Sequence, residues 1–113
     1  MIPASVRIFV CTVPQDMRRS FDALALATQQ LLGQDPMCGA LYVFVGKSST
    51  RVKILWWDRN GYCLLYKRLH RALFRIPQAE DGGASLRIDG AALAQLLAGV
   101  ATEKRKHSEI STS

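Results

Sequence analysis

The residues best suited to chemistry in this sequence are cations interleaved with aromatic rings in the middle of the chain. Residues 47–75 contain eight basic side chains and one acid, Asp58, so this segment carries +7 while the rest of the chain carries −1. Lys and Arg bind phosphate oxygens, and Trp or Tyr rings stack on bases or sugars. The segment therefore predicts contact with an anionic polymer, with nucleic acid as the leading partner.

Two strands of a hairpin would place these cations and rings on one face. Strands are predicted over residues 51–57 and 62–69, joined by a two-residue loop at Arg59-Asn60 or at Asn60-Gly61, of which Asn60-Gly61 is a strong hairpin signal. With a two-residue loop, odd positions of the first strand share a face with even positions of the second. That face contains Arg51, Lys53, Leu55, Trp57, Tyr62, Leu64, Tyr66 and Arg68. The opposite face is expected to be core, with Lys67 at its margin, and contains Val52, Ile54, Trp56, Cys63, Leu65 and Leu69.

Candidate DNA-binding residues follow from this arrangement. Phosphate contacts are assigned to Arg51, Lys53, Lys67, Arg68, Arg71 and Arg75, and stacking or apolar contacts to Trp57, Tyr62 and Tyr66. Arg18 and Arg19, near the expected start of a helix, are secondary candidates. Purely structural roles for these residues stay open, because aromatic residues also pack well in strands and cations on an edge strand also prevent aggregation.

Catalytic, metal and cofactor motifs are not evident in the sequence. Gly46-Lys47-Ser48 resembles the end of a P-loop, but Leu41 stands where that motif needs glycine. His70 and His107 lack metal-ligand spacing, and no carboxylates are recognisably paired for acid–base or two-metal chemistry. We expect a non-enzymatic protein without cofactors; a nuclease acting through Asp58 is the alternative.

The elements that must position these residues begin with a strand over residues 6–13, which Pro14 is expected to end. Asp16 is placed as the N-cap of a helix that extends to Leu32, with Gly33 at its C-terminal end. Further strands are expected over residues 41–45, 73–76 and 86–88. Asp89 is expected to cap a second helix over residues 89–100.

These elements predict a single α+β domain over residues 1–102, followed by a polar flexible tail over residues 103–113. The domain is expected to have a mostly antiparallel sheet of four to six strands, with the first helix on one face and the second nearby. A chain of 113 residues that is 49% hydrophobic fits one folded domain and excludes a large multi-domain enzyme.

Three cysteines, odd in number and without a Cys-x-x-Cys pair, argue against a disulfide framework or a zinc site. They suit a reducing compartment, so we expect a cytoplasmic protein, associated with the nucleoid if it binds DNA. The longest apolar runs are too short to span a membrane, and the first residues do not resemble a signal peptide.

Several blocks together resemble the TnpB (second open reading frame) accessory proteins of the insertion-sequence-sixty-six family of bacterial transposable elements. They are Asp16-Met17-Arg18-Arg19-Ser20-Phe21-Asp22, Leu41-Tyr42-Val43-Phe44, Lys53-Ile54-Leu55-Trp56-Trp57-Asp58 and Tyr66-Lys67-Arg68-Leu69. The resemblance covers roughly residues 5–100. It implies an accessory role in transposition, beside a separately encoded DDE transposase and another accessory protein.

The leading hypothesis is thus a non-catalytic accessory protein that binds DNA with weak sequence selectivity. The alternative is an interaction module that docks on the transposase without contacting DNA, its basic face meeting an acidic partner surface. A homo-oligomer also remains open, because an exposed Trp57 or an unpaired strand edge would serve a dimer as readily as DNA.

Overall fold

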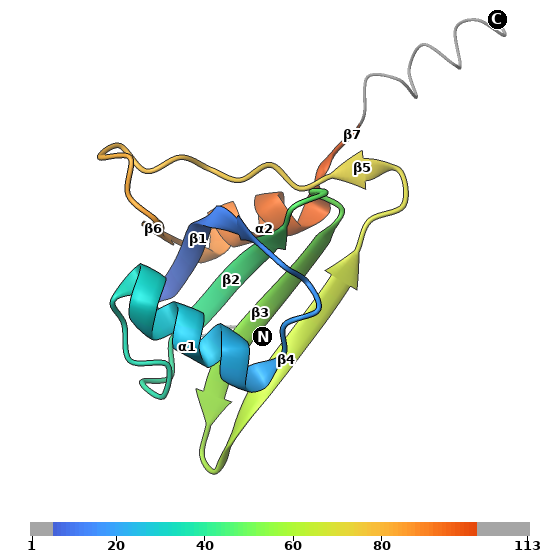
Figure 1. The fold of residues 1–113 in the computed structure, drawn as a ribbon. Coiled ribbons are helices and arrows are strands. Elements are labelled where there is room, and N and C mark those ends of the chain that lie inside the picture. Colours follow the sequence, from blue (N-terminus) through green and yellow to red (C-terminus); the bar gives the residue numbers. More distant parts are fainter. Residues whose placement is uncertain (1–5, 102–113) are drawn as a thin grey trace, which may run out of the picture.

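Strand β2 (Leu41–Gly46) lies at the centre of the fold, and all of its residues are buried. The computed structural model describes residues 6–101, whose main sheet has the strand order β4-β3-β2-β1-β6 (Figure 1). The other strands of this sheet are β1 (Ile8–Gln15), β3 (Arg51–Asp58), β4 (Gly61–Arg68) and β6 (Ser85–Ile88). A small second sheet pairs β5 (Ala72–Leu73) with β7 (Val100–Ala101).

One helix packs on each face of the main sheet, because successive side chains of a strand point to opposite faces. Helix α1 (Phe21–Leu32) buries Leu24 and Leu32 against Tyr42, Phe44 and other residues of one face. Helix α2 (Gly90–Ala98) covers the other face with two buried leucines, against a cluster that contains Val10, Val43, Val52 and Ile54. We call these faces the α1 side and the α2 side.

The sheet is mostly antiparallel, with one parallel pair. Strands β1 and β2 run parallel, with Ile8 opposite Leu41, and α1 provides the crossover between them. The pairs β2–β3, β3–β4 and β1–β6 are antiparallel. The predicted α+β class and the predicted sheet of four to six strands are therefore confirmed.

The start of α1 differs from the prediction. The helix begins at Phe21, and its N-cap is Ser20, whose side chain makes no capping hydrogen bond. Asp16 instead accepts a hydrogen bond from the backbone N–H of Arg18 at 2.9 Å, in a turn that precedes the helix. The signal for an N-cap was misleading because aspartate stabilises such local turns by the same kind of bond.

Other boundaries also shift. Pro14 does not end β1, which continues to Gln15; the pairing of β1 with β2 becomes irregular between Cys11 and Gln15. The strand expected over residues 73–76 is reduced to the two residues of β5, and the second helix ends at Ala98 rather than at residue 100. The polar tail predicted over residues 103–113 lies outside the described residues.

Asp89 is the N-cap of α2, as predicted. Its carboxylate oxygen Oδ1 accepts a hydrogen bond from the backbone N–H of Ala92 at 2.8 Å. This bond satisfies one of the free donors in the first turn of the helix. The cap holds the helix that buries Leu93 and Leu96 on the α2 side.

Replacing Asp89 with alanine should therefore lower the free energy of unfolding by about 1 kcal/mol, because the donor in the first turn of α2 loses its partner. Urea denaturation followed by circular dichroism measures this change. Glu80→Ala, which removes an exposed carboxylate outside the helix, is the matched control and should change stability by less than about 0.5 kcal/mol. Equal effects of the two substitutions would contradict the capping role.

Candidate functional site

The hairpin of β3 and β4 has one of the two registers that the sequence allows, with Arg59-Asn60 as its two-residue loop. Asp58 pairs with Gly61 across a two-residue loop, Arg51 with Arg68, Lys53 with Tyr66, and Trp57 with Tyr62. The residues that were predicted to share a face with Arg51 and Lys53 do so, and this face is the α1 side. Part of this face is covered, because Leu55, between Lys53 and Trp57 on the same side, packs against α1 and is fully buried.

Lys53 is buried on this face, with only 8% of its surface exposed. Its ammonium group donates a hydrogen bond to the backbone carbonyl of Arg19 at 2.7 Å and lies 5.0 Å from the centre of the Tyr66 ring. A buried cation needs such partners because its desolvation is costly. Lys53 therefore positions the segment before α1 and is not part of the exposed basic surface.

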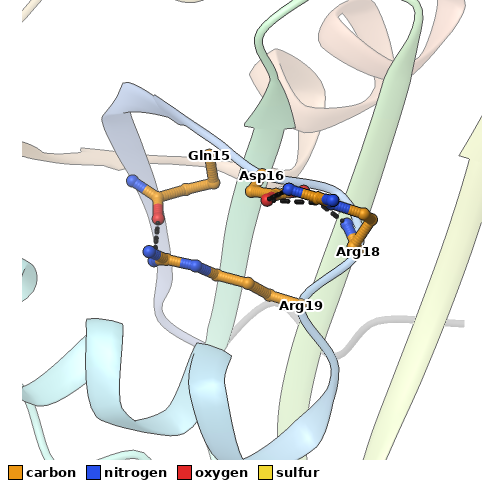
Figure 2. Close-up of polar contacts among 4 residues, drawn as sticks. All are labelled: Gln15, Asp16, Arg18 and Arg19. Carbon is orange, nitrogen blue, oxygen red and sulfur yellow. Dashed lines mark hydrogen bonds and ion pairs between the residues drawn. The ribbon is translucent and has the colours of Figure 1, made fainter.

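That segment is further fixed by its own polar contacts (Figure 2). The Arg18 guanidinium donates to both carboxylate oxygens of Asp16, with the shortest contact at 2.7 Å. These bonds hold the pKa of Asp16 well below its usual range. Arg19 donates to the side-chain oxygen of Gln15 at 2.8 Å, and Gln15 is buried with its amide nitrogen bonded to the carbonyl of Val13.

A polar crevice of about 290 Å³ opens where β1 and β2 end. These strands are parallel, so the residues that follow them meet at the same end of the sheet. The carboxyl ends of parallel strands are a common location for binding sites. The crevice is lined by Gln15, Asp16, Met17, Arg18, Lys47, Ser48 and Arg51. Its construction needs the glycine at the end of β2, because a Cβ on Gly46 would lie 2.6 Å from the Cγ atom of Met17.

Cations from three distant parts of the chain gather at this end of the sheet. Arg18 and Arg19 come from the segment before α1, Lys47 follows β2, and Arg51 at the start of β3 pairs with Arg68 at the end of β4. All of these side chains are exposed. We call Arg18, Arg19, Lys47, Arg51 and Arg68 the basic cluster.

The charge of the basic cluster is only partly compensated. Asp16 is the one acid among the residues that line the crevice, and its carboxylate is already paired with Arg18. Five cations beside one carboxylate leave a strong positive potential, which favours an anionic ligand. A ligand with several negatively charged groups could contact more than one of these cations at once.

Trp57 and Tyr62 lie at the other end of the hairpin. Their rings contact edge to face, with centroids 5.0 Å apart and an interplanar angle of 79°. Trp57 lies six positions along the strand from Arg51, a distance of about 20 Å. Both rings are half-buried, and Tyr62 packs against the α1-side core. Among the predicted stacking residues, Tyr66 is the one beside the basic cluster, and 52% of its surface is exposed.

Two predicted cations lie on the α2 side. The Lys67 ammonium donates to the carbonyl of Leu97 near the C-terminal end of α2 at 2.8 Å, where the helix dipole favours a positive charge. Arg75 lines a crevice of about 270 Å³ together with Ile88 and Leu96. Arg71 is exposed in the segment between β4 and β5. The structure thus divides the predicted site between two faces of the sheet.

Within residues 6–101, no group of three or more His, Cys, Asp or Glu side chains is arranged to hold a metal ion. None of the helices described over the same residues is long and apolar enough to cross a membrane.

Comparison with known proteins identifies the family. Residues 6–107 match the family described as "IS66 Orf2 like protein". The chain belongs to this family. The resemblance detected in the sequence is thereby confirmed, and membership indicates an accessory protein of transposition.

Two curated proteins of Sinorhizobium fredii are similar to this IS66 Orf2-like protein. "Uncharacterized protein y4hO" is 41% identical over 102 residues, which cover 88% of this chain and 87% of the relative. "Uncharacterized protein y4jC" is 36% identical over 77 residues, which cover 68% of this chain and 66% of the relative. No solved structure matches the chain.

Lys47 is the cluster residue that the sequence analysis did not select. It is one of the eight basic residues of segment 47–75 and part of the P-loop-like Gly46-Lys47-Ser48, but it is not among the predicted site residues; no helix follows it, since β3 begins at Arg51. The sequence did not indicate that β1 and β2 pair in parallel. That pairing would have placed Lys47 beside the residues that follow β1.

The positioning role of Lys53 in this IS66 Orf2-like protein can be tested by Lys53→Met, which keeps the aliphatic stem and removes the ammonium group. The free energy of unfolding should fall by about 1–2 kcal/mol, because the Arg19 carbonyl loses a charge-assisted hydrogen bond. Arg51→Met, an exposed change two residues away on the same face, should cost less than about 0.5 kcal/mol. Chemical denaturation measures both; an unchanged stability of Lys53→Met would show that the bond does not hold the segment.

Proposed function

We propose that this protein is a non-catalytic accessory protein of insertion-sequence transposition that binds DNA through the basic cluster, with weak sequence selectivity. The observation that carries the proposal is the convergence of cations from three separate segments around one crevice. Membership of this family also supports the proposal, because an accessory protein of transposition acts where DNA is the available polyanion.

The cluster supports binding to the phosphate backbone. Its side chains are long, exposed and placed along one end of the sheet, so they can contact several phosphates of one DNA strand. Tyr66 and Arg68 are two residues apart on the α1 side of β4, which places an exposed ring beside a cation. The ring adds apolar or stacking contact with a sugar or an unpaired base.

Weak sequence selectivity is expected from the side chains that the two helices present. A recognition helix enters the major groove with polar or charged side chains that reach base edges. Helix α1 has Asp22 as its single charged residue, and α2 has no charged residue. Neither helix therefore presents a cation, and their exposed amide side chains, Gln29 and Gln30 of α1 and Gln95 of α2, lie outside the basic cluster, so phosphate contacts dominate the expected affinity.

The proposal predicts the effect of removing two cluster charges. Arg51→Ala combined with Arg68→Ala should weaken binding to a labelled duplex several-fold. It should also reduce the slope of log K against log salt by about 2, because two phosphate contacts are lost. Fluorescence anisotropy over a salt series, with duplexes of element-end and scrambled sequence, measures both quantities.

The matched control is Arg7→Ala combined with Arg87→Ala, which removes the same charge from exposed positions at the opposite end of the sheet. This control should leave the salt slope nearly unchanged. Equal losses in the two double variants would indicate a general charge effect and contradict the cluster as the DNA surface. If wild type does not bind at low salt, the basic cluster would be assigned to an acidic surface of the transposase instead.

A further inference from the structure

Strand β4 forms one edge of the main sheet, and no other described strand pairs with its outer side. It has eight residues, whereas β6 at the opposite edge has four. In Figure 1 it is the long strand farthest from β6, beside β3. A sheet edge of this length presents a row of backbone donors and acceptors that can pair with another strand.

The backbone groups on the outer side of β4 follow from its pairing with β3. The N–H of Leu69 donates to the carbonyl of Thr50 at 2.8 Å, so this opposed pair is a hydrogen-bonded one. Hydrogen-bonded and non-hydrogen-bonded pairs alternate along an antiparallel ladder. The register of β3 and β4 therefore directs outward the backbone N–H and C=O groups of Tyr62, Leu64, Tyr66 and Arg68.

This edge lacks the features that usually protect a strand edge. The first six residues of β4, from Gly61 to Tyr66, contain no charge and no proline. Leu65 is 42% exposed on the α2 side, and Tyr66 is also exposed on the α1 side. Lys67 is charged, but its ammonium group is directed to the carbonyl of Leu97 on α2. The apolar part of the edge is therefore open.

We infer that this edge pairs with the β4 strand of a second copy, antiparallel and around a two-fold axis at Leu65. The four outward-directed residues are symmetric about Leu65. In this register Tyr62 pairs with the partner's Arg68 and Leu64 pairs with the partner's Tyr66, so every outward-directed backbone group is used. Shifting the register between the two β4 strands in either direction leaves some of these backbone groups without partners.

The charges of β4 fit the same register. Arg68 lies opposite the partner's Tyr62 and Lys67 opposite the partner's Cys63, so no cation faces its own copy. A parallel pairing of the same strands would bring like charges together, which is unfavourable. At the axis, Leu65 meets the partner's Leu65 in a non-hydrogen-bonded pair, whose side chains approach closely. The sequence of this one strand is thus complementary to itself.

The dimer forms one continuous sheet in which both α1 sides face the same way. The side chains of Tyr62 and the partner's Arg68 then lie on a common surface. Each copy keeps its own basic cluster on that surface, because Arg68 contributes only its backbone to the strand-to-strand hydrogen bonds and its side chain stays on the α1 side. The pairing does not depend on DNA binding and is tested separately from it.

The first test is the mass of the full-length protein by size-exclusion chromatography with light scattering. Wild type should have about 25 kDa, twice the 12.5 kDa of one chain. Leu65→Lys should have about 12.5 kDa, because two cations would meet at the axis. Leu26→Lys makes the same substitution at a leucine of α1 that is 50% exposed, and it should remain a dimer.

The second test is cross-linking of Leu65→Cys in a Cys38→Ser, Cys63→Ser background, where Cys11 is buried. Opposed Cα atoms of a non-hydrogen-bonded pair lie about 4.5 Å apart, which permits a disulfide. Oxidised glutathione should convert most of this variant to a covalent dimer and leave Leu26→Cys in the same background without a cross-link. This test decides the matter if circular dichroism shows that Leu65→Lys does not fold.

Three results would overturn the inference. They are a wild-type protein that stays monomeric from micromolar to millimolar concentration, a Leu65→Lys variant that folds and stays dimeric, and a Leu65→Cys variant that does not cross-link. The first would leave the edge available to a strand of another protein, and the second would place the dimer contact on another surface.

Discussion

The hydrogen bond from the Lys53 ammonium to the Arg19 carbonyl is the interaction on which the site depends. Strand β3 is covered on both faces near Lys53, so its cation cannot reach bulk water freely and must be satisfied within the protein. Its ammonium group donates to a backbone carbonyl just before α1 and also lies 5.0 Å from the centre of the Tyr66 ring. The bond ties the segment from Asp16 to Ser20 to the α1 side of β3. That attachment brings Arg18 to the crevice that Lys47 and Arg51 line.

The alternation of side chains along a strand explains why the basic residues lie on two different faces of the sheet. A strand sends neighbouring residues to opposite faces, so Lys67 and Arg68 cannot serve one surface even though they are adjacent. Arg68 joins the basic cluster on the α1 side, and Lys67 contacts the carboxyl end of α2. The positive charge of residues 47–75 is thus concentrated in sequence but divided in space. The surface that remains most basic is the one where parallel strands β1 and β2 both end.

The two surfaces of interest use different parts of the hairpin. The basic cluster depends on side chains at the end of the sheet where β3 begins and β4 ends, whereas the edge of β4 depends on backbone groups along its length. Side-chain contacts with phosphate and backbone contacts with a second strand do not compete for the same atoms. An accessory protein of transposition can therefore bind a polyanion and associate with a second copy through one hairpin. In the inferred dimer, two basic clusters would lie on the same side of the continuous sheet.

Much of the fold is determined locally and was predictable. The sharing of faces in the hairpin follows from the pleat and a two-residue loop, and the cap of α2 follows from Asp89 and the apolar positions after it. Gly33 ends α1 in the left-handed conformation, as its position in the sequence indicates. The start of α1 was not predictable, because aspartate in a turn and aspartate at an N-cap make the same local bond, and Asp16 forms the turn.

The sequence by itself determined which residues share a face of the hairpin, because that depends only on strand periodicity and loop length. It did not determine which face α1 and α2 cover, nor that β1 and β2 are parallel. Those features arise from packing between segments far apart in the chain, which no local pattern encodes. For that reason Lys53 could be assigned to the correct face but not recognised as buried, and Lys47 could be seen as a cation but not placed in the cluster. Tertiary structure alone decided which cations are free to meet a ligand.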